Sequence, residues 1–372
     1  MRRVAPAAAT LMALVAASAG SGCGERQHGA TPLADFSVPF VFGRFEVPED
    51  NPLTEEAVEL GRRLFYDRRL SGNHAVSCAT CHQQRLAFTD GRATGVGVSG
   101  RPLAFNSMSL ANLMWGPQRF FWNGRADSLE EQVLVPIENP DEMDRDLQQL
   151  VAELGADADY RLRFDAAYGE VSAEAISRAL ATFLRTLVSA NSRYDRYLRG
   201  EITLDAQEEL GRKLFMAHPD VKASLRGANC IDCHSQFLTS GFSAGLDGFS
   251  NNGLDDEQHL QPGLEAVTGD PAHRGMFKVP TLRNIALTAP YMHDGRFATL
   301  EEVLRHYNGG VQPSATLSPL IVEASNVDGA SPSGISLQLS EEEQAAVVAF
   351  LHTLTDPDFL TAERFSDPFV PQ

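Results

Sequence analysis

Two short clusters contain the residues whose types and spacing are best suited to chemistry. Residues 77–82 read SCATCH and residues 229–234 read NCIDCH, so each cluster has two thiols with two residues between them and a histidine directly after the second. In a helical turn, positions i, i+3 and i+4 share one face. The two thiols can therefore bond the two vinyl groups of one haem, with the histidine under its iron. A zinc site and a redox dithiol are the alternatives.

The setting of the clusters favours haem over both alternatives. Zinc ribbons space two cysteine pairs by roughly 15–20 residues, whereas these pairs lie in different halves of the chain. A thioredoxin-like dithiol needs a βαβ context, and alternating strand patterns are scarce here. The sequence therefore predicts two covalent c-type haems, with His82 and His234 as proximal ligands and with thioether bonds from Cys78, Cys81, Cys230 and Cys233.

Each cluster follows a copy of the same helical segment. ELGRRLF (59–65) precedes the first cluster and ELGRKLF (209–215) precedes the second, at almost the same distance. Residues 172–190 and 341–354 also have the apolar spacing of amphipathic helices. Ser or Thr three residues before Glu predicts capping boxes, and thus helix starts, within 128–132, 299–302 and 340–343. We expect a mainly α fold with one helix-plus-cluster unit in each of two domains.

Length and charge limit the organisation and the partners. A chain of 372 residues has room for roughly two domains. We predict an N-terminal haem domain at 45–190 and a C-terminal haem domain at 200–360, with the junction near 190–205. The net charge of −18 argues against nucleic acid, whose binding needs clustered lysine and arginine, and it fits a solvated acidic surface.

Residues 1–23 have the layout of an export signal. Arg2 and Arg3 precede the apolar stretch LMALVAASAG, and small residues lead to Cys23. The segment GSGC resembles a relaxed lipobox, in which Cys23 becomes the lipidated first residue; plain secretion with cleavage nearby is the alternative. No later run is long and apolar enough to span a bilayer. We therefore expect a periplasmic or cell-envelope protein, with a lipid anchor through Cys23 as one form.

Longer stretches around both clusters resemble one known family. LGRRLFYDRRLSG, FFWNGRADSLEEQ and KVPTLRNIALTAPYMHDGRFATLEEVLRHYNGG, together with the clusters, look like the bacterial di-haem cytochrome c peroxidase and MauG family. The match runs from about residue 50 to 355 and is specific in sequence, order and spacing. The resemblance implies two cytochrome-c-like helical domains, each with one haem, and a calcium ion between them.

By this resemblance, the first haem does the peroxide chemistry. Some members hold its iron with a removable distal histidine between two glycines, and Val96, between Gly95 and Gly97, occupies the corresponding position. The first haem is therefore expected to have an open distal face, as in MauG-like members. His74 is an alternative ligand, although we favour a surface role for it.

Four residues match the family's catalytic machinery. Glu142 matches the catalytic glutamate by its spacing from FFWNGR, while Gln132 and Pro136 match residues that line the same pocket. A carboxylate can carry a proton from the near oxygen of peroxide to the leaving one; a solvated acid at a helix start is the alternative for Glu142. Trp122 matches the tryptophan between the two haems, where an indole can relay electrons, and a purely structural tryptophan is its alternative.

The second haem decides the subtype. Peroxidases of the family have a methionine fourteen residues after the histidine of PYFH-like motifs, and MauG-like members have a tyrosine there. Fourteen residues after His293 this chain has Tyr307. Thioether sulfur is soft and raises the potential, whereas phenolate is hard and stabilises highly oxidised iron. We expect Tyr307 as the sixth ligand with His293 supporting the site, and Met292 and Met276 are the alternative ligands.

The family's calcium ion is held by an asparagine side chain and backbone carbonyls. The matching residues are Asn106, Thr288 and Pro290. Oxygen donors suit this hard cation.

These features support one main hypothesis and two alternatives. The main hypothesis is a di-haem c-type peroxidase that reduces hydrogen peroxide with electrons from a redox partner, either a small cytochrome c or a cupredoxin. A MauG-like enzyme that oxidises residues of a partner protein is the first alternative, which Tyr307 and Val96 favour. A non-catalytic di-haem electron-transfer cytochrome is the second; Glu142 and Gln132 beside an open iron face argue against it.

Overall fold

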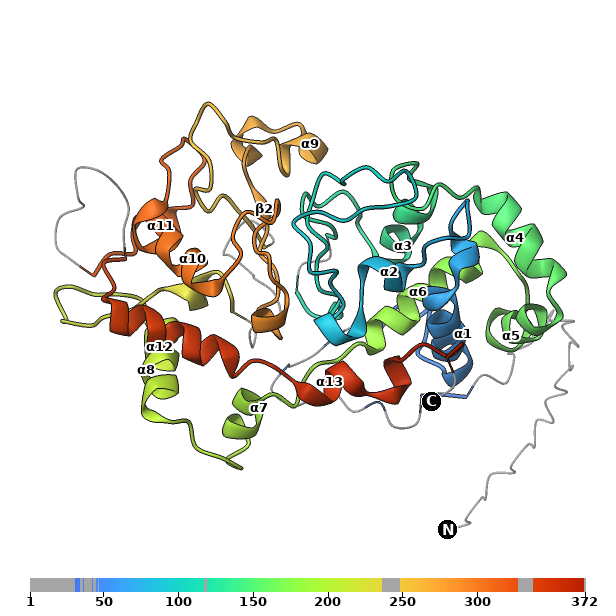
Figure 1. The fold of residues 1–372 in the computed structure, drawn as a ribbon, viewed down its shortest axis with the longest axis horizontal. Helices are drawn as coiled ribbons and strands as arrows, with labels where there is room; N and C mark the ends of the chain where they lie inside the picture. Colours follow the sequence, from blue (N-terminus) through green and yellow to red (C-terminus); the bar gives the residue numbers. More distant parts are fainter. Residues whose placement is uncertain are drawn as a thin grey trace, which may run out of the picture.

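Two helical lobes lie side by side in the protein (Figure 1). The structure, a computed structural model, describes residues 31–33, 36, 42, 45, 47–116, 119–235, 248–326 and 337–370. The predicted export signal and Cys23 lie outside the described residues. None of the helices in the described ranges is long and apolar enough to cross a membrane.

Helices α1 to α6 form the first lobe in the described part of the chain. They are α1 (Glu55–Tyr66), α2 (Cys78–Cys81), α3 (Leu129–Glu138), α4 (Leu147–Ala156), α5 (Ala158–Tyr168) and α6 (Ala173–Thr186). The predicted start of α3 is confirmed, because the Ser128 side chain accepts a hydrogen bond from the Glu131 N–H. Such a cap satisfies one of the free N–H groups at a helix start.

The second lobe contains shorter helices and a minimal sheet. Its helices are α7 (Arg193–Leu198), α8 (Ala206–Met216), α9 (Glu265–Thr268), α10 (Leu300–Arg305), α11 (Pro319–Val322) and α12 (Glu341–His352). Strands β1 (Phe249–Ser250) and β2 (Phe277–Lys278) pair antiparallel, with Phe249 opposite Lys278. The capping boxes predicted at the starts of α10 and α12 are both present. The mainly α fold is therefore confirmed.

The repeated segment is a helix whose glycine faces another helix closely. A Cβ on Gly61 of α1 would overlap the backbone carbonyl of Ala179 in α6, and a Cβ on Gly211 of α8 would overlap that of Ala346 in α12. Only glycine allows so close an approach of two backbones. The repeat thus sets an equivalent helix crossing in each lobe, and each crossing lies next to one thiol cluster.

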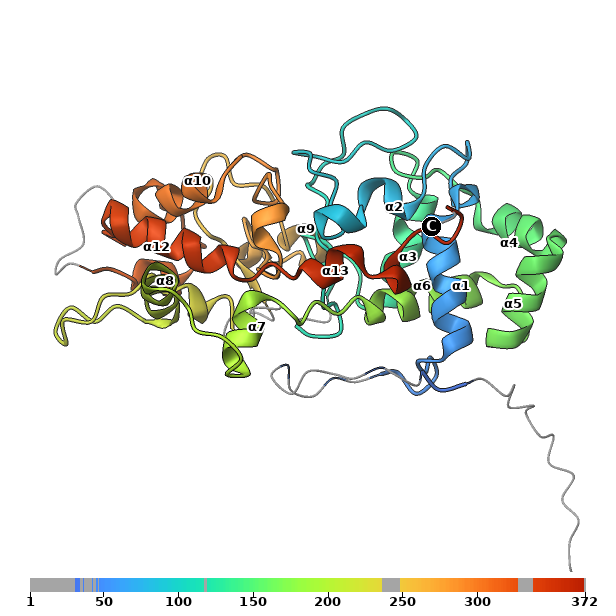
Figure 2. The same ribbon diagram turned by 60° about the horizontal axis from the view of Figure 1, so that its bottom comes forward.

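Each lobe has its own hydrophobic core. One core is centred on α1, α3 and α6, and the other on α8, α10 and α12. The C-terminal helix α13 (Pro357–Thr361) returns from the second lobe to the first (Figure 2). There Phe359 and Phe365 pack on Phe88. The chain end therefore ties the two lobes together, while the domain boundaries stay a prediction.

A buried ion pair stabilises the start of the second lobe. Arg283 and Asp195 are 0% and 1% exposed, and their side chains form a salt bridge. The N–H and the hydroxyl of Ser192 also donate to the same carboxylate. The pair fixes α7 against the segment that precedes α10.

Two candidate haem cavities and the contact between them

The first thiol cluster opens into a cavity of the first lobe. Cys78 and Cys81 are on the single-turn helix α2, and His82 follows at its end. All three residues line a cavity of about 380 Å³, which lies within the roughly 300–1,000 Å³ of ordinary ligand pockets. The structure therefore brings the predicted haem-binding group together at a cavity of suitable size.

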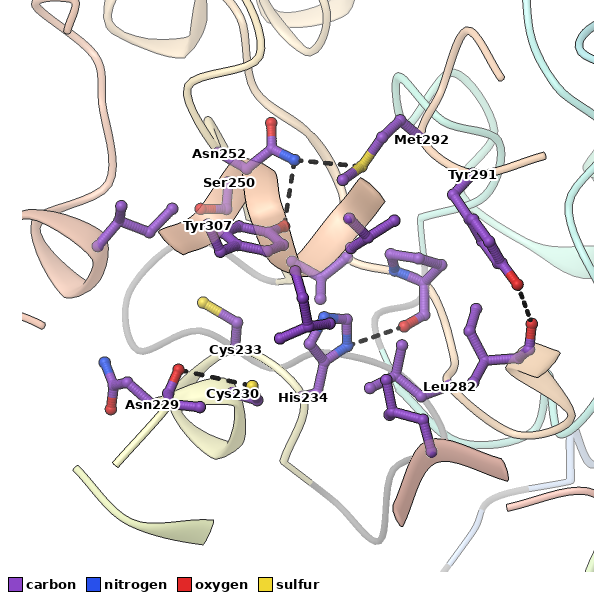
Figure 3. A pocket seen from close by; sticks show the side chains of 18 of the residues that line it. Asn229, Cys230, Cys233, His234, Ser250, Asn252, Leu282, Tyr291, Met292 and Tyr307 are labelled. Carbon is purple, nitrogen blue, oxygen red and sulfur yellow. Dashed lines mark hydrogen bonds between the residues drawn. The ribbon is translucent and has the colours of Figure 1, made fainter. Parts of the chain in front are cut away.

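The second cluster has the same arrangement in the other lobe. Cys230 lies in a short 3-10 turn (Cys230–Asp232), and Cys233 and His234 follow it. These residues line one side of a cavity of about 190 Å³, and Tyr307 and Met292 line the other side (Figure 3). Both cavities thus have thiols and a histidine on one wall.

Both histidines have the orientation that an iron ligand needs. His82 Nδ1 lies 2.8 Å from the Phe88 carbonyl oxygen, and His234 Nδ1 lies 3.2 Å from that of Pro280. A ring whose Nδ1–H donates to a carbonyl is fixed in the tautomer that presents Nε2 to a metal. Burial lowers the pKa of His82 and lowers that of His234 to about 4. Both rings are therefore neutral at pH 7, as a metal ligand must be.

The thiols do not suit the alternative chemistries. Burial raises the pKa of Cys78 and Cys230 to about 12 and that of Cys81 and Cys233 to about 11. Dithiol exchange needs a thiolate, which this burial disfavours. In the described part of the chain, no three His, Cys, Asp or Glu side chains gather as they would around a metal ion. Thioether bonds to haem, which consume the thiols, fit this setting better.

The lining of the first cavity also contains the predicted acid, Glu142. One carboxylate oxygen of Glu142 accepts a hydrogen bond from the Asn139 amide at 2.8 Å and lies 3.7 Å from the Arg125 guanidinium. Burial raises the pKa of Glu142 above its ordinary value, although the bond from Asn139 and the charge of Arg125 oppose this rise. A carboxyl with a raised pKa, beside an open cavity, is suited to taking up and releasing protons.

Helix α3 presents Gln132 and Pro136 to the same cavity. The two residues are four apart and therefore share one helix face. Pro136 has no N–H, so it leaves the Gln132 backbone carbonyl without its helical partner. The side-chain oxygen of Gln132 is buried without a hydrogen-bond partner. Buried polar atoms are normally paired, so this oxygen fits a group that binds in the cavity.

Arg125 lines the same cavity, and sequence reasoning did not assign it a role. Its guanidinium stacks on the Phe121 ring, 3.6 Å from the ring centroid, and faces Glu142. Burial lowers the pKa of Arg125, while the Glu142 carboxylate acts in the opposite direction. Its place in FFWNGR, directly after the glycine, was the available signal, but one sequence does not show where such a side chain points.

Trp122 and Lys278 line both cavities. The indole N–H of Trp122 donates to the Asn106 carbonyl at 2.9 Å, and its ring meets the His293 ring edge to face at 6.5 Å. The Lys278 N–H donates to the Trp122 carbonyl at 2.8 Å. Trp122 thus lines both cavities, while its place between two haems stays a prediction. Lys278 is a further residue that sequence reasoning missed.

His293 lies beside the second cavity, buried between aromatic rings. It stacks on Phe277 with ring centroids 3.6 Å apart, and its Nε2 is buried without a hydrogen-bond partner. Burial lowers the pKa of His293 to about 4. The neutral ring has a free nitrogen at the cavity wall, which suits a supporting role towards a bound group.

Tyr307 and Met292 are both placed to reach a group in the second cavity. Tyr307 lies on a π-helical turn (His306–Gly310) that extends α10, and such turns are frequent at functional sites. The Asn252 amide lies 3.3 Å from the Tyr307 hydroxyl and 3.5 Å from the Met292 sulfur (Figure 3). Burial raises the pKa of Tyr307 to about 12. The phenol is therefore neutral here, and a nearby iron would have to favour the phenolate.

Other alternative ligands lie elsewhere. Met276 packs with Phe249 and Leu264 and is not among the described residues that line the second cavity. His74 is exposed and lies 3.6 Å from the Glu153 carboxylate, in agreement with a surface role. Among the described residues that line the first cavity, His82 is the single histidine, and the segment with Val96 contributes Gly97.

Asn106 is surrounded by oxygen atoms that suit a hard cation. Its side-chain amide lies 2.8 Å from the Arg92 carbonyl oxygen, and 3.3 Å from those of Ala93 and Pro290. Thr288 and Pro290 line a small cavity together with Asn106. Rotating the Asn106 amide by 180° would point its oxygen, in place of its nitrogen, towards these three carbonyl oxygens. The oxygen atoms would then form a site of the kind that calcium prefers. The residues present therefore fit a calcium ion.

Sequence comparison relates the chain to proteins with two haems. The family model described as di-haem cytochrome c peroxidase matches residues 55–203. The methylamine utilization protein MauG of Methylorubrum extorquens is 38% identical over 311 residues, which are 82% of this chain and 80% of that protein. The cytochrome c551 peroxidase of Nitrosomonas europaea is 33% identical over 316 residues, 83% of each chain.

Structural comparison finds solved proteins with a similar fold. The crystal structure of a MauG-like protein associated with microbial copper homeostasis has a TM-score of 0.78 and 38% identity, and covers 91% of this chain and 100% of its own. The di-haem peroxidase BthA of Burkholderia thailandensis has a TM-score of 0.65 at 23% identity, covering 87% of this chain and 91% of its own. The second similarity concerns the fold alone.

Proposed function

Because this chain belongs to the di-haem cytochrome c peroxidase and MauG family, we propose that its two cavities divide the reduction of hydrogen peroxide between them. The chain is a haem peroxidase-type oxidoreductase with two haems. We assign peroxide to the first cavity. The observation that carries this assignment is the partly buried carboxyl of Glu142 in the lining of the cavity that His82 also lines.

The residues of the first cavity prepare peroxide for cleavage. When bound, the haems supply the iron that takes peroxide and a store for the oxidising equivalents. Glu142 takes the proton of the near oxygen and returns it to the leaving oxygen, which departs as water. Asn139 holds one oxygen of the carboxylate throughout. In total, peroxide takes up two electrons and two protons and becomes two water molecules.

Neighbouring residues orient the reactants and stabilise charge. The free side-chain oxygen of Gln132 can accept a hydrogen bond from the peroxide. The Arg125 guanidinium, fixed by its stacking on Phe121, stabilises negative charge that develops on the leaving oxygen. Pro136 contributes an apolar ring to this cavity lining. The polar contacts with peroxide are therefore left to Gln132 and Glu142.

Trp122 links the two cavities in the proposal. Its indole lines both of them and is fixed by the hydrogen bond to the Asn106 carbonyl. An electron from the second site reaches the first by way of this ring. His293, edge to face with Trp122, orients the indole from the second cavity.

The substrate that restores the electrons has two candidate classes. A small cytochrome c or a cupredoxin would make the protein a cytochrome c peroxidase, and a residue of a partner protein would make it a MauG-like enzyme. Tyr307 supports the second class, because its hydroxyl lies in the second cavity, where a phenolate favours highly oxidised iron. Relatives of both names are similar to this chain over most of its length.

We further propose calcium at Asn106 and export through residues 1–23 to the periplasm or cell envelope. The oxygen group around Asn106 supports the calcium ion. The layout of Arg2, the apolar stretch and Cys23 supports export, with lipid attachment to Cys23 as one form. Mass spectrometry of the mature N-terminus decides between lipidation and plain cleavage.

Donor oxidation by the haem-loaded protein tests the peroxidase proposal. Reduced small cytochrome c or reduced cupredoxin is mixed with the protein, and peroxide starts the reaction. We expect saturable oxidation of one donor with two electrons taken per peroxide. If peroxide oxidises neither donor and does not alter the haem spectrum, the proposed function is wrong. A changed haem spectrum without donor oxidation would favour the MauG-like class.

A further inference from the structure

The linings of the two cavities have Trp122 and Lys278 in common within the described ranges. Trp122 has the relay role proposed above. Lys278 brings a positive charge to the same place, and lysine is rarely buried. The burial of this lysine side chain therefore calls for a structural or functional explanation.

The fold holds Lys278 against the relay at several points. Strand β2 places it opposite Phe249, and its N–H donates to the Trp122 carbonyl at 2.8 Å. Its ammonium donates to the Arg119 carbonyl and lies 4.8 Å from the centroid of the Phe120 ring. A carbonyl oxygen and an aromatic face both stabilise a cation. The residue is 8% exposed, so water screens its charge weakly.

A charge at this position acts on any electron transfer through the indole. When Trp122 gives up an electron, its ring becomes positive within the same cavity linings that hold Lys278, and the two like charges repel. A positive charge on the indole is confined to one small ring, whereas the same charge on a haem is spread over a macrocycle. The repulsion is therefore greater for the oxidised indole than for either oxidised haem.

We propose that the Lys278 ammonium keeps the oxidising equivalents on the two haems and off Trp122. This inference rests on the proposed function, in which peroxide reacts in the first cavity and Trp122 relays. Peroxide takes two electrons, one from each haem, and two protons. Trp122 gives one electron towards the first cavity and regains one from the second, so it ends unchanged. Lys278 shortens the time for which the indole lacks that electron and so protects it from side reactions.

Three haem-loaded variants, compared with the wild type at pH 6, test the proposal. Burial lowers the pKa of Lys278 to about 7, so the wild-type ammonium is charged at this pH. Lys278→Met removes the charge and keeps the length, while Lys278→Arg keeps the charge. Lys213→Met is the matched control, because it removes a lysine charge from a site on α8 that is 66% exposed.

Two readouts separate charge from shape. Spectroelectrochemistry of the resting proteins gives the haem midpoint potentials without peroxide. Peptide mass spectrometry after a few peroxide equivalents gives the fraction of Trp122 that has gained oxygen. We expect Lys278→Met to lower both potentials and to raise Trp122 oxidation several-fold, with Lys278→Arg and Lys213→Met equal to the wild type.

Several results would overturn the proposal. Unchanged potentials and unchanged Trp122 oxidation in Lys278→Met would show that the charge does not act on the relay. Equal changes in Lys278→Met and Lys278→Arg would assign the effect to shape. Failure of Lys278→Met to take up haem would show that the ammonium serves folding. A wild-type protein inert to peroxide would instead remove the proposed function itself and this inference with it.

Discussion

Replacing Glu142 with glutamine should remove the proton carrier of the first cavity with little other change. Glutamine has nearly the same size, and its carbonyl oxygen can still accept the 2.8 Å hydrogen bond from Asn139. The lost 3.7 Å charge contact with Arg125 is partly exposed, with side-chain exposures of 30% and 20%, so its removal changes stability little. The remaining effect is on proton transfer.

The size of that effect follows from general acid–base catalysis. A positioned acid or base contributes typically about 10²–10⁴-fold to a rate, which corresponds to about 3–5 kcal/mol of barrier. We expect the rate of the peroxide reaction to fall by that factor in Glu142→Gln while haem content and the resting spectrum stay normal. Stopped-flow absorbance at stoichiometric peroxide measures the rate. Glu138→Gln, at the exposed end of α3 and four residues before Glu142, is the matched control.

The pH profile gives an independent check. Burial raises the pKa of Glu142 above its ordinary value of 4.5, and the reaction needs the ionised form as the first proton acceptor. The wild-type rate should therefore fall as the pH drops through this raised pKa, and Glu142→Gln should lack that acid limb. A variant rate within threefold of the wild type, or an unchanged acid limb, would refute the assignment.

Three further predictions concern the framework. Gly61→Ala should lower the free energy of unfolding by about 1–3 kcal/mol, because its Cβ meets the backbone of α6. Gly155→Ala has open space on α4 and should raise the free energy of unfolding by about 0.5–1 kcal/mol. Urea unfolding measures both values. Arg283→Met should lower the free energy of unfolding by about 3–5 kcal/mol, because it leaves the buried Asp195 carboxylate without its ion pair. Arg193→Met removes an exposed pair and should lower it by at most about 1 kcal/mol. Equal losses in the two variants would contradict this prediction. Saturating calcium should stabilise the wild type by about 2.7 kcal/mol at a hundred times its Kd, and Asn106→Ala should abolish that response in calorimetry; a retained response would move the ion elsewhere.

The helices were the most predictable part of the fold. Capping boxes at 299–302 and 340–343 and the repeated segment at 59–65 and 209–215 correspond to helices of the structure. These signals are local, since caps and apolar spacing act within one or two turns. The return of α13 to the first lobe is different. It depends on Phe359 and Phe365 meeting Phe88, which no local pattern indicates.

The candidate site divides in the same way. His82 and His234 were readable because the haem motif fixes its ligand within five residues. The sequence did not indicate three further residues of the site: Arg125, Lys278 and Asn252. Each contacts a residue that is distant in the sequence, and only the folded chain brings the two together. The choice between Tyr307 and Met292 also stays a prediction, since both side chains reach the second cavity and the same amide lies close to both.

One experiment on the haem-loaded protein tests the central claim most directly: electron paramagnetic resonance and magnetic circular dichroism of the resting state, repeated after one equivalent of peroxide. Our account predicts one high-spin haem, at the open first cavity, and one low-spin haem with histidine and tyrosine ligands. It also predicts that peroxide alters the signals of both haems together. A methionine charge-transfer band would contradict the assignment of Tyr307, and two low-spin haems that do not respond to peroxide would contradict the account as a whole.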